Sequence, residues 1–368
     1  MMRVKLEDVC EKGSSNLKQS DVVNLTGEYP IYGAAGYIGN VDFYHQEKPY
    51  VAIVKDGAGI GRTTLHPAKS SVIGTMQYLL PKDNVLPEYL CYVVRHMHLE
   101  KYFTGATIPH IYFRDYKNEK FNLASLDKQA EIVGILKKAE SVIRKRRQQL
   151  TELDNLIKAR FVEMFGDMLL NEMGWQEVHL DALADVVSGI TKGRKVREAE
   201  LIEVPYMAVS NVKDGYIDWT TVKTIMATKQ EIEQYRLLPY DVLMTEGGDP
   251  DKLGRGAVIA APLENSIHQN HIFRVRLQLE KILPVFFSQY LQNPKAKQYF
   301  LGCAKQTTGI ASINMKQLRS LPVLVPPIEL QEQFAAFVEQ VDKSKVVVQN
   351  ALDEAQTLFD SLMQEYFG

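Results

Sequence analysis

Two stretches of the chain, residues 126–166 and 328–368, carry a regular spacing of apolar positions that predicts long helices. In each stretch apolar residues recur at alternating intervals of three and four, and the stripe persists for about five turns of the heptad pattern. This spacing is typical of a helix that packs along its length against another helix. We expect the two helices to pair as an antiparallel coiled coil through Ile132, Leu136, Ile143, Leu150, Leu153 and Ile157 of the first and Phe334, Val338, Val341, Val348, Leu352, Phe359 and Leu362 of the second.

The two stretches also align with each other without a gap, at a constant offset of 202 residues (328 minus 126). Seven paired positions are identical, among them Gln129 with Gln331 and Leu156 with Leu358. A repeat of this length, half a chain apart, indicates one structural unit used twice. Pro327 is well placed to start the second helix, and Gly166 to cap the end of the first.

The remaining blocks alternate short β-branched runs with Gly, Pro and Asn turns, which predicts α+β domains with mostly antiparallel, curved β-sheets. The blocks are also related to each other, because Gly61-Arg62 has a counterpart in Gly254-Arg255 and Leu86-Pro87 in Leu283-Pro284. The whole chain therefore predicts a pseudo-two-fold internal repeat. We expect four domains, at residues 1–125, 126–166, 167–327 and 328–368.

Composition and charge narrow the possible functions. Apolar residues make up 45% of the chain and charged residues 24%, as in ordinary globular proteins. The net charge of −2 excludes a strongly basic nucleic-acid wrapper. It also hides an asymmetry: residues 126–166 carry nine basic and six acidic groups (+3), whereas residues 328–368 carry two and eight (−6). These opposite charges favour pairing of the two helices.

The chain shows no stretch of about eighteen apolar residues and no apolar signal-peptide core, so a cytoplasmic location is expected. Three cysteines, Cys10, Cys91 and Cys303, are odd in number and far apart, which favours buried free thiols over disulfides or a zinc site.

The motifs of catalysis are missing from the sequence. An adenine methyltransferase would need a [DN]PP[FY] motif, and the adjacent prolines Pro326-Pro327 lack it; a P-loop motif is absent too. Asp249-Pro-Asp251-Lys252 has the residue types of a nuclease site, but a polar turn explains it better. The pairs His96/His98 and His268/His271 each lack a nearby third metal ligand. We therefore expect a non-catalytic chain without a metal.

Loops with basic and polar side chains are the candidates for DNA contact. Arginine and lysine bind phosphates, and arginine also reads guanine edges. For any single one of these residues, a solvated loop position is about as good an explanation. For Arg144–Arg147, mid-helix, we favour pairing with the acidic helix or a partner over phosphate contact. The candidates are Lys55, Arg62, His110, Tyr112 and Arg114 in the first block, and Lys192, Arg194, Lys195, Arg197, Arg255 and Gln306 in the second.

Three strings carry a family resemblance: Tyr29-Pro-Ile-Tyr-Gly-Ala-Ala-Gly, Trp175-x-x-Val-His-Leu-Asp-Ala-Leu, and Pro326-Pro-Ile-Glu-Leu-Gln-Glu-Gln-Phe. Together with the order of block, helix, block and helix, they resemble the specificity (S) subunit of Type I restriction–modification systems over essentially the whole chain. The first helix departs from the pattern, because it begins Ser125-Leu-Asp without the double proline.

The resemblance implies that each block is a target-recognition domain for one half of an asymmetric, bipartite double-stranded DNA target, with the helices setting the spacer. It implies two methyltransferase (M) subunits, which carry S-adenosylmethionine and methylate adenine. It further implies restriction (R) subunits, which use ATP and Mg²⁺ to cleave unmethylated DNA. No cofactor is expected in this chain. Two alternatives stay open: a specificity module of a methyltransferase-only or Type II-like system, and a coiled-coil scaffold that does not bind DNA. The target sequence and spacer length do not follow from the sequence.

Overall fold

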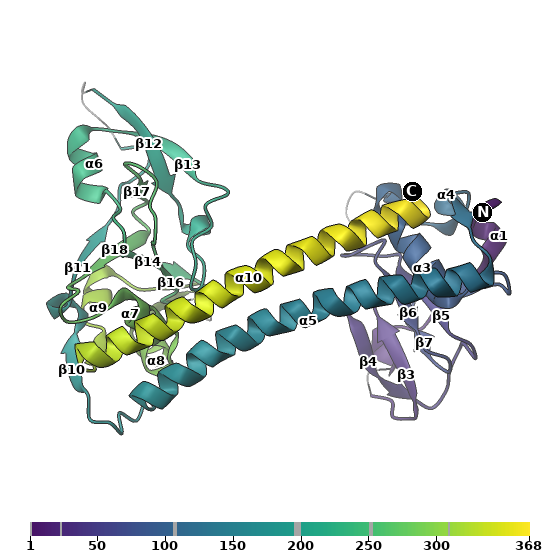
Figure 1. Cartoon of the computed structure of the whole chain (residues 1–368), viewed down its shortest axis with the longest axis horizontal. Helices are drawn as coiled ribbons and strands as arrows, with labels where there is room; N and C mark the ends of the chain where they lie inside the picture. The colour runs from purple at the N-terminus through teal and green to yellow at the C-terminus, as the bar shows by residue number, and fades with distance from the viewer. Residues whose placement is uncertain (1, 23, 106–108, 195–199, 250–252, 308–309) are drawn as a thin grey trace. The chain divides into compact units, whose positions relative to one another are not determined.

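The computed structural model describes residues 2–22, 24–105, 109–194, 200–249, 253–307 and 310–368 (Figure 1). The chain divides into two compact units. Unit 1 comprises Met1–Gln149 and Val348–Gly368, and unit 2 comprises Leu150–Val347. Each unit therefore combines one globular block with one part of each long helix. The four-domain division expected from the sequence stays a prediction.

The globular part of unit 1 is built from short strands and four short helices. Its elements are β1 (Met2–Lys5), α1 (Leu6–Val9), β2 (Cys10–Ser14), α2 (Gln19–Val22), β3 (Tyr29–Gly33), β4 (Gly36–Val41), β5 (Tyr50–Val54), β6 (Thr63–His66), β7 (Ser71–Val72), β8 (Met76–Pro81), α3 (Pro87–His96), α4 (Phe113–Tyr116) and β9 (Lys120–Leu123), with a 3-10 turn at Leu99–Tyr102.

The globular part of unit 2 follows a similar plan with longer insertions. Its elements are β10 (Gln176–His179), β11 (Ala184–Ser188), β12 (Ile202–Met207), β13 (Lys223–Ala227), α6 (Lys229–Tyr235), β14 (Val242–Thr245), β15 (Gly247–Gly248), β16 (Gly256–Val258), β17 (Ile267–His268), β18 (Ile272–Leu277), α7 (Pro284–Gln292), α8 (Pro294–Cys303), β19 (Lys305–Thr307), β20 (Ile310–Ser312), α9 (Met315–Arg319) and β21 (Pro322–Val325), with 3-10 turns at Leu180–Ala182 and Val209–Asn211.

The three sheets of unit 1 have counterparts in unit 2, which also contains the three-stranded sheet β15-β20-β19. The four-stranded sheet β2-β8-β5-β6 of unit 1 corresponds to β11-β18-β14-β16 of unit 2, and the pair β1-β9 corresponds to β10-β21. Each unit also has a three-stranded sheet in which a two-residue strand pairs in parallel, β7 with β3 and β17 with β12. The predicted α+β class and the internal repeat are confirmed.

The core of each unit lies between its four-stranded sheet and a helix that starts with proline. In unit 1 the central strand β5 is buried throughout, and it packs with α3, whose Pro87 occupies the first helical turn. In unit 2 the helix α7 starts in the same way at Pro284. The thiols of Cys10 and Cys91 are free and buried, and that of Cys303 is free and half-buried.

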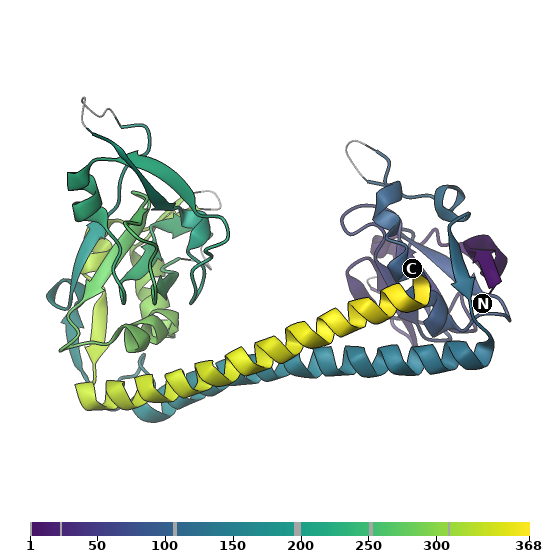
Figure 2. The ribbon, with the colours of Figure 1, turned by 45° about the horizontal axis from the view of Figure 1, so that its top comes forward.

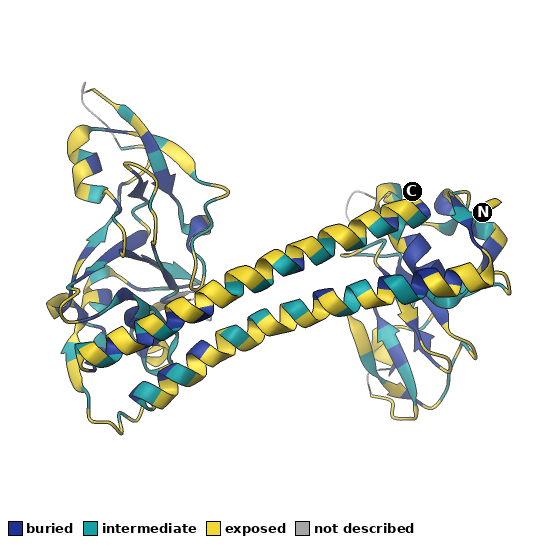
Figure 3. Cartoon of the chain, viewed as in Figure 1, coloured by how far each residue is buried: buried dark blue, intermediate teal, exposed yellow. Residues whose placement is uncertain are grey.

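The two long helices, α5 (Leu126–Phe165) and α10 (Ile328–Phe367), have 40 residues each. Gly166 ends α5 with a positive φ of 75°, and its N–H donates to the carbonyl of Val162 at 2.8 Å, as predicted for a C-terminal cap. Buried and half-buried positions alternate with exposed ones along both helices (Figure 3). No helix within the described ranges is long and apolar enough to cross a membrane.

Within each unit α5 and α10 lie side by side (Figures 1 and 2). In unit 2 the contact is aromatic: Phe161 and Phe165 of α5 pack against Phe334 of α10, with ring centroids 5.4 and 5.5 Å apart, and Phe286 of α7 completes the cluster. In unit 1 the start of α5 and the end of α10 share a core with α3, where Phe367 packs on Tyr89 with ring centroids 5.2 Å apart. The chain directions of these pairs make the packing antiparallel.

The predicted seam positions differ in burial along the helices. Most of those close to a globular block are buried, whereas several others are covered only in part. The buried ones are Ile132, Leu136, Ile143, Ile157, Phe334, Val338, Val341 and Leu352, and the half-buried ones are Leu150, Leu153, Val348, Phe359 and Leu362.

Polar contacts between the helices join individual side chains. Lys345 of α10 pairs with Asp154 of α5 at 2.7 Å, with the cation on the more acidic helix. Arg147 of α5 donates to the side-chain oxygen of Gln356 of α10 at 3.4 Å. The contribution of the opposite net charges to helix pairing stays a prediction.

A buried glutamine fixes the start of each long helix to its globular block. The Gln129 side chain accepts from the N–H of Leu86 at 2.8 Å and donates to the carbonyls of Asn84 and Ala124. The Gln331 side chain accepts from the N–H of Leu283 at 2.9 Å and donates to the carbonyls of Lys281 and Pro326. Both glutamines are fully buried, so the identity noted in the sequence corresponds to one duplicated anchor.

Candidate nucleic-acid interface

The loop that follows β5 in unit 1 is closed by backbone hydrogen bonds. The N–H of Val54 donates to the carbonyl of Arg62 at 2.9 Å, and the N–H of Lys55 donates to that of Thr75 at 3.0 Å. The N–H of Ile111 donates to the carbonyl of Lys55 at 3.0 Å, so the segment ending at Ile111 is held beside the loop. Residues far apart in sequence are thus gathered at one end of the central strand.

Unit 2 repeats this backbone frame after β14. The N–H of Thr245 donates to the carbonyl of Arg255 at 3.1 Å, and the N–H of Glu246 donates to that of His271 at 3.0 Å. The N–H of Ile313 in turn donates to the carbonyl of Glu246 at 2.9 Å. Three hydrogen bonds therefore have direct counterparts in the two units, and they place Arg62 and Arg255 at equivalent positions.

A carboxylate and a histidine occupy this frame in unit 1. Asp56 accepts from the Nδ1 atom of His110 at 2.6 Å, and its other oxygen accepts from the Lys55 ammonium at 2.5 Å. Partial burial alone would raise the pKa of Asp56, but the hydrogen bonds from Lys55 and His110 hold it below its usual value. The carboxylate is thus ionised near neutral pH. Because its Nδ1 is held, His110 is left with Nε2 for a further hydrogen bond.

The other unit 1 candidates border the same cluster. The Arg114 guanidinium lies over the Tyr112 ring at 4.8 Å from its centroid, and both side chains are exposed. The Tyr112 ring stacks on that of His110 at a centroid distance of 6.4 Å. Arg62 is exposed and donates to the carbonyl of Ala34 at 3.0 Å. All five candidates of the first block, including Lys55, therefore lie on two neighbouring segments.

Unit 2 holds a similar pair that the sequence did not reveal. Glu246 accepts from Nδ1 of His271 at 2.6 Å, and the exposed His271 ring also contacts the side-chain amide of Asn270 at 3.3 Å through Nε2. Both pairs combine an acid in the loop after the central strand with a histidine. The two pairs do not occupy equivalent positions, however, because Glu246 corresponds to Lys55 in the shared frame and His271 to Thr75. An alignment of the two blocks therefore could not match them.

The Arg194 side chain is bound to a partner within the chain and is not free in the loop. Its guanidinium makes a two-pronged ion pair with Glu231, at 2.5 and 2.6 Å, and donates to the carbonyl of Met226. The Arg194 hydrogen bond, with burial opposing it, lowers the pKa of Glu231 to about 2. The expectation of a freely exposed Arg194 is corrected, because the ion pair ties it to the β13–α6 connection. Its DNA contact stays a prediction.

The other unit 2 candidates are placed only in part. Lys192 is exposed. Arg255 is half-buried and borders a pocket of about 250 Å³, together with Asp214 and Lys297. Lys195 and Arg197 lie outside the described residues, as does the side chain of Gln306 on β19.

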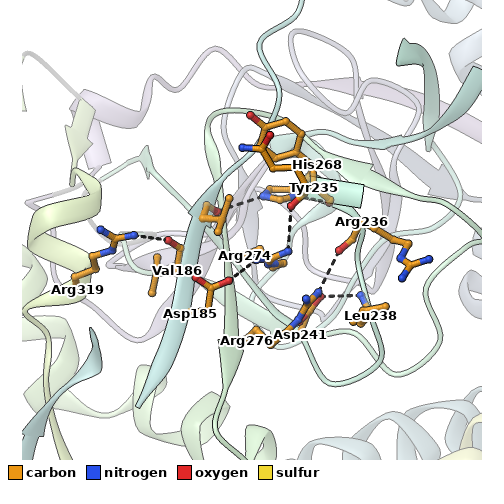
Figure 4. Close-up of polar contacts among 12 residues, drawn as sticks. Asp185, Val186, Tyr235, Arg236, Leu238, Asp241, His268, Arg274, Arg276 and Arg319 are labelled. Atoms are coloured by element: carbon orange, nitrogen blue, oxygen red, sulfur yellow. Dashed lines mark hydrogen bonds and ion pairs between the residues drawn. The ribbon is translucent and has the colours of Figure 1, made fainter. Parts of the chain in front are cut away.

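A polar network in unit 2 joins buried groups, Asp241, His268 and Arg274, to the more exposed Asp185 and Arg276 (Figure 4). Arg276 binds both oxygens of Asp241, at 2.7 and 2.8 Å, and Asp241 also accepts from the N–H of Leu238. Arg274 pairs with Asp185 at 2.6 Å. His268 faces two backbone carbonyls, and burial lowers its pKa to about 4. The network ties the segment after α6 to the four-stranded sheet on which the loops stand.

Clusters of possible metal ligands were a second kind of site to consider in the described part of the chain. No group of three His, Cys, Asp or Glu side chains there could hold a metal ion. His268 is fully buried, and its two ring nitrogens face the backbone carbonyls of Tyr235 and Val187. Asp251 and Lys252 of the acidic turn lie outside the described residues. What the two loop clusters offer is exposed hydrogen-bonding side chains, suited to binding.

Comparison with known proteins places these features in a family. The chain matches the model described as Type I restriction modification DNA specificity domain over residues 1–154 and 172–355. It is 26% identical over 169 residues to the Type I restriction enzyme EcoKI specificity subunit of Escherichia coli K12, covering 44% of this chain and 36% of that protein. The chain thus aligns with less than half the length of this curated relative.

Two solved structures share the fold. The S subunit of a Type I restriction–modification system from M. genitalium superposes with a TM-score of 0.60 at 14% identity, covering 100% of this chain and 96% of that one. A structure reported for complex assembly and conformational transition of the type I R-M system superposes with a TM-score of 0.56 at 16% identity, covering 99% and 97%. Since the family model spans both globular blocks and most of both helices, the chain belongs to the family of Type I restriction modification DNA specificity domains.

Proposed function

We propose that this chain is the non-catalytic specificity subunit of a Type I restriction–modification complex, and that each unit reads one half of a bipartite DNA target. The observation that carries the proposal is the duplicated loop frame with different side chains in it. Asp56 and His110 stand in one frame, and Glu246 and His271 in the other. Because equivalent positions of the frame present different groups, such as Lys55 in one unit and Glu246 in the other, the two half-sites should differ in sequence, and the target should be asymmetric.

The reactions would be performed by partner subunits. Two methyltransferase subunits with S-adenosylmethionine would methylate an adenine in each half-site, for which the base must leave the DNA stack. Restriction subunits with ATP and Mg²⁺ would cleave unmethylated DNA. The role of this chain would be positional: phosphate contacts from residues such as Arg62 and Arg114 orient it, and base contacts specify the sequence.

The long helices would determine the spacer between the half-sites. Each helix begins at a glutamine anchor in one globular block, so its starting point on that block is fixed by three hydrogen bonds. A helix rises about 1.5 Å per residue, so helix length converts directly into distance. Constant helix length would then give constant spacer length.

Mapping of N6-methyladenine in host DNA tests this function. The chain is co-expressed with its cognate methyltransferase subunit in a host without other adenine methylation. We expect methylation at one asymmetric motif made of two half-sites and a fixed spacer, and none when this chain is omitted. A motif that does not depend on this chain, or one uninterrupted palindrome, would contradict the proposal.

A further inference from the structure

Three polar side chains of unit 2 form a chain of hydrogen bonds at the end of the central strand. Glu246 directly follows β14, and its carboxylate accepts from Nδ1 of His271 at 2.6 Å. Nε2 of the same ring lies 3.3 Å from the side-chain nitrogen of Asn270. We call Glu246, His271 and Asn270 the unit 2 relay.

The carboxylate at one end of the relay determines the direction of each hydrogen bond. A carboxylate only accepts hydrogen bonds, so Nδ1 of His271 carries the hydrogen. The other nitrogen of the neutral imidazole, Nε2, is then an acceptor. The Asn270 amide therefore donates one of its two N–H groups to Nε2. Its side-chain oxygen and its second N–H are left for other partners.

Both the backbone and the side chain of Asn270 are held in place. Its N–H donates to the carbonyl of Ile190 at 3.1 Å, and its carbonyl accepts from the Ser188 hydroxyl at 2.6 Å. Asn270 is half-buried, and the His271 ring beside it is exposed. Within the described ranges, no further hydrogen bond engages the Asn270 side chain. One acceptor and one donor are thus fixed side by side and left unused.

The frame itself does not need the relay, because unit 1 builds the same frame without it. The positions of the relay hold different residues in unit 1, namely Lys55, Gly74 and Thr75. The Gly74 N–H still donates to a backbone carbonyl, that of Leu17, at 2.8 Å, as the Asn270 N–H does in unit 2. A relay that is accessible and unnecessary for the backbone frame points to a ligand outside the chain.

We propose that Asn270 is a specificity-determining residue that reads an adenine in the major groove, and that His271 and Glu246 position its amide. The inference rests on the proposed function. Adenine presents the N6 amine as a donor beside N7 as an acceptor, which matches the free oxygen and N–H of Asn270. Guanine offers two acceptors there, cytosine a donor and thymine an acceptor, so each satisfies only one of the two groups. Because unit 1 has Gly74 at this position, the contact belongs to one half-site.

Substitutions of Asn270 test this contact. Asn270→Ala removes both groups that would bind the base. Asn270→Asp keeps the shape but replaces the donor with a second acceptor, which suits the N4 amine of cytosine. The matched control is Asn265→Asp, the same change at an exposed asparagine of unit 2. Each full-length variant is assembled with the cognate methyltransferase subunit and selects binding sites from a randomised DNA pool. Thermal melting verifies that each variant is folded.

We expect the wild-type complex to select an A·T pair at one position of one half-site. Asn270→Ala should reduce that preference by about five- to 150-fold, and Asn270→Asp should replace it with a preference for C·G. Asn265→Asp should select the wild-type motif. His271→Gln should relax the same position, and adding it to Asn270→Ala should cause no further loss, since it acts through Asn270.

An unchanged motif in both Asn270 variants would overturn the inference. So would the same change of base preference in Asn265→Asp, or a wild-type preference for G·C at the position that responds to Asn270. Additive losses in the double variant would refute the positioning role of His271. If the wild-type complex selects no bipartite motif that depends on this chain, the proposed function fails instead, independently of Asn270.

Discussion

The two units have the same backbone frame around their loops but different side chains behind it. In unit 1, the residues behind the loop cluster are aromatic and neutral: Tyr50 accepts from the Ser70 hydroxyl, and Tyr78 accepts from the N–H of Val72. In unit 2, the corresponding region is held by the ionic pairs of Arg274 and Arg276. The backbone frame that carries the loops is nevertheless the same. The comparison teaches that the frame and the helix anchors are shared, whereas the groups that fill and surround the frame are free to vary.

The largest expected effect on stability is a difference between a buried and a half-buried position of the helix pair. Phe334→Ala removes a fully buried ring from the aromatic cluster of unit 2 and should lower the free energy of unfolding by about 3–5 kcal/mol. Val348→Ala, at a half-buried seam position, should lower it by only about 1 kcal/mol. Urea denaturation measures both. Equal losses would mean that the seam is packed uniformly.

The second prediction concerns the feature that both units share. Gln129→Leu removes the hydrogen-bond partner of the Leu86 N–H and of two carbonyls, of which that of Ala124 is buried, and Gln331→Leu does the same around Leu283. Each should lower the free energy of unfolding by about 2–4 kcal/mol. The control is Gln333→Leu, which changes an exposed glutamine on α10. It should change the free energy of unfolding by less than about 0.5 kcal/mol. A small effect at either anchor would break the equivalence of the two units.

The third prediction uses pH to compare the interiors. Burial lowers the pKa of His66 in unit 1 and of His268 in unit 2 to about 4. Their folded pKa lies below the unfolded value of about 6.5, so their neutral forms stabilise the fold above that pH, and this stability is lost as the pH falls toward 4. Each histidine should cost about 2 kcal/mol between pH 7 and pH 5. His66→Gln and His268→Gln should each flatten the measured unfolding free energy over this range; an unchanged slope would count against burial as the cause.

The smallest effect on stability is expected at the loops that carry His110 and His271. There the expected effect is on DNA recognition instead. His110→Gln and His271→Gln alter exposed or half-exposed rings and should change the free energy of unfolding by less than about 0.5 kcal/mol. Each should weaken discrimination at one base pair by about 1–3 kcal/mol, in different half-sites. Binding selection from a randomised DNA pool measures this. His98→Gln, an exposed histidine with its own acidic neighbour Glu100, is the control and should leave the preference unchanged.

Much of the scaffold could be predicted from the sequence because it rests on local or repeated patterns. The apolar stripe predicts the helix ends to within one residue of Phe165 and Phe367, and Gly166 marks the cap. The equivalence of Arg62 and Arg255 follows from glycine loops after similar strands. These features depend on residues close together in sequence, or on an offset that can be read directly.

Features that depend on distant partners could not be predicted. Arg194 looks like part of a free basic loop until Glu231, 37 residues away, is brought beside it. His271 looks like half of a weak metal motif until the turn after β14 places Glu246 next to it. Net charge likewise does not show which charges meet: the ion pair between Lys345 and Asp154 has its cation on the more acidic helix. Whether a polar side chain is bound within the fold or exposed therefore depends on its neighbours in three dimensions, and residue type alone does not show it.

The central claim is that paired helices set the distance between two independent DNA-reading units. Inserting four helical residues after Gln149 and four after Val347, the boundaries of the units, lengthens both helices by about 6 Å, comparable with about two base pairs. Methylation mapping of this variant beside wild type measures the spacer directly. The account predicts both half-sites unchanged and a spacer longer by about two base pairs. An unchanged spacer, or altered half-sites at the original spacing, would contradict it.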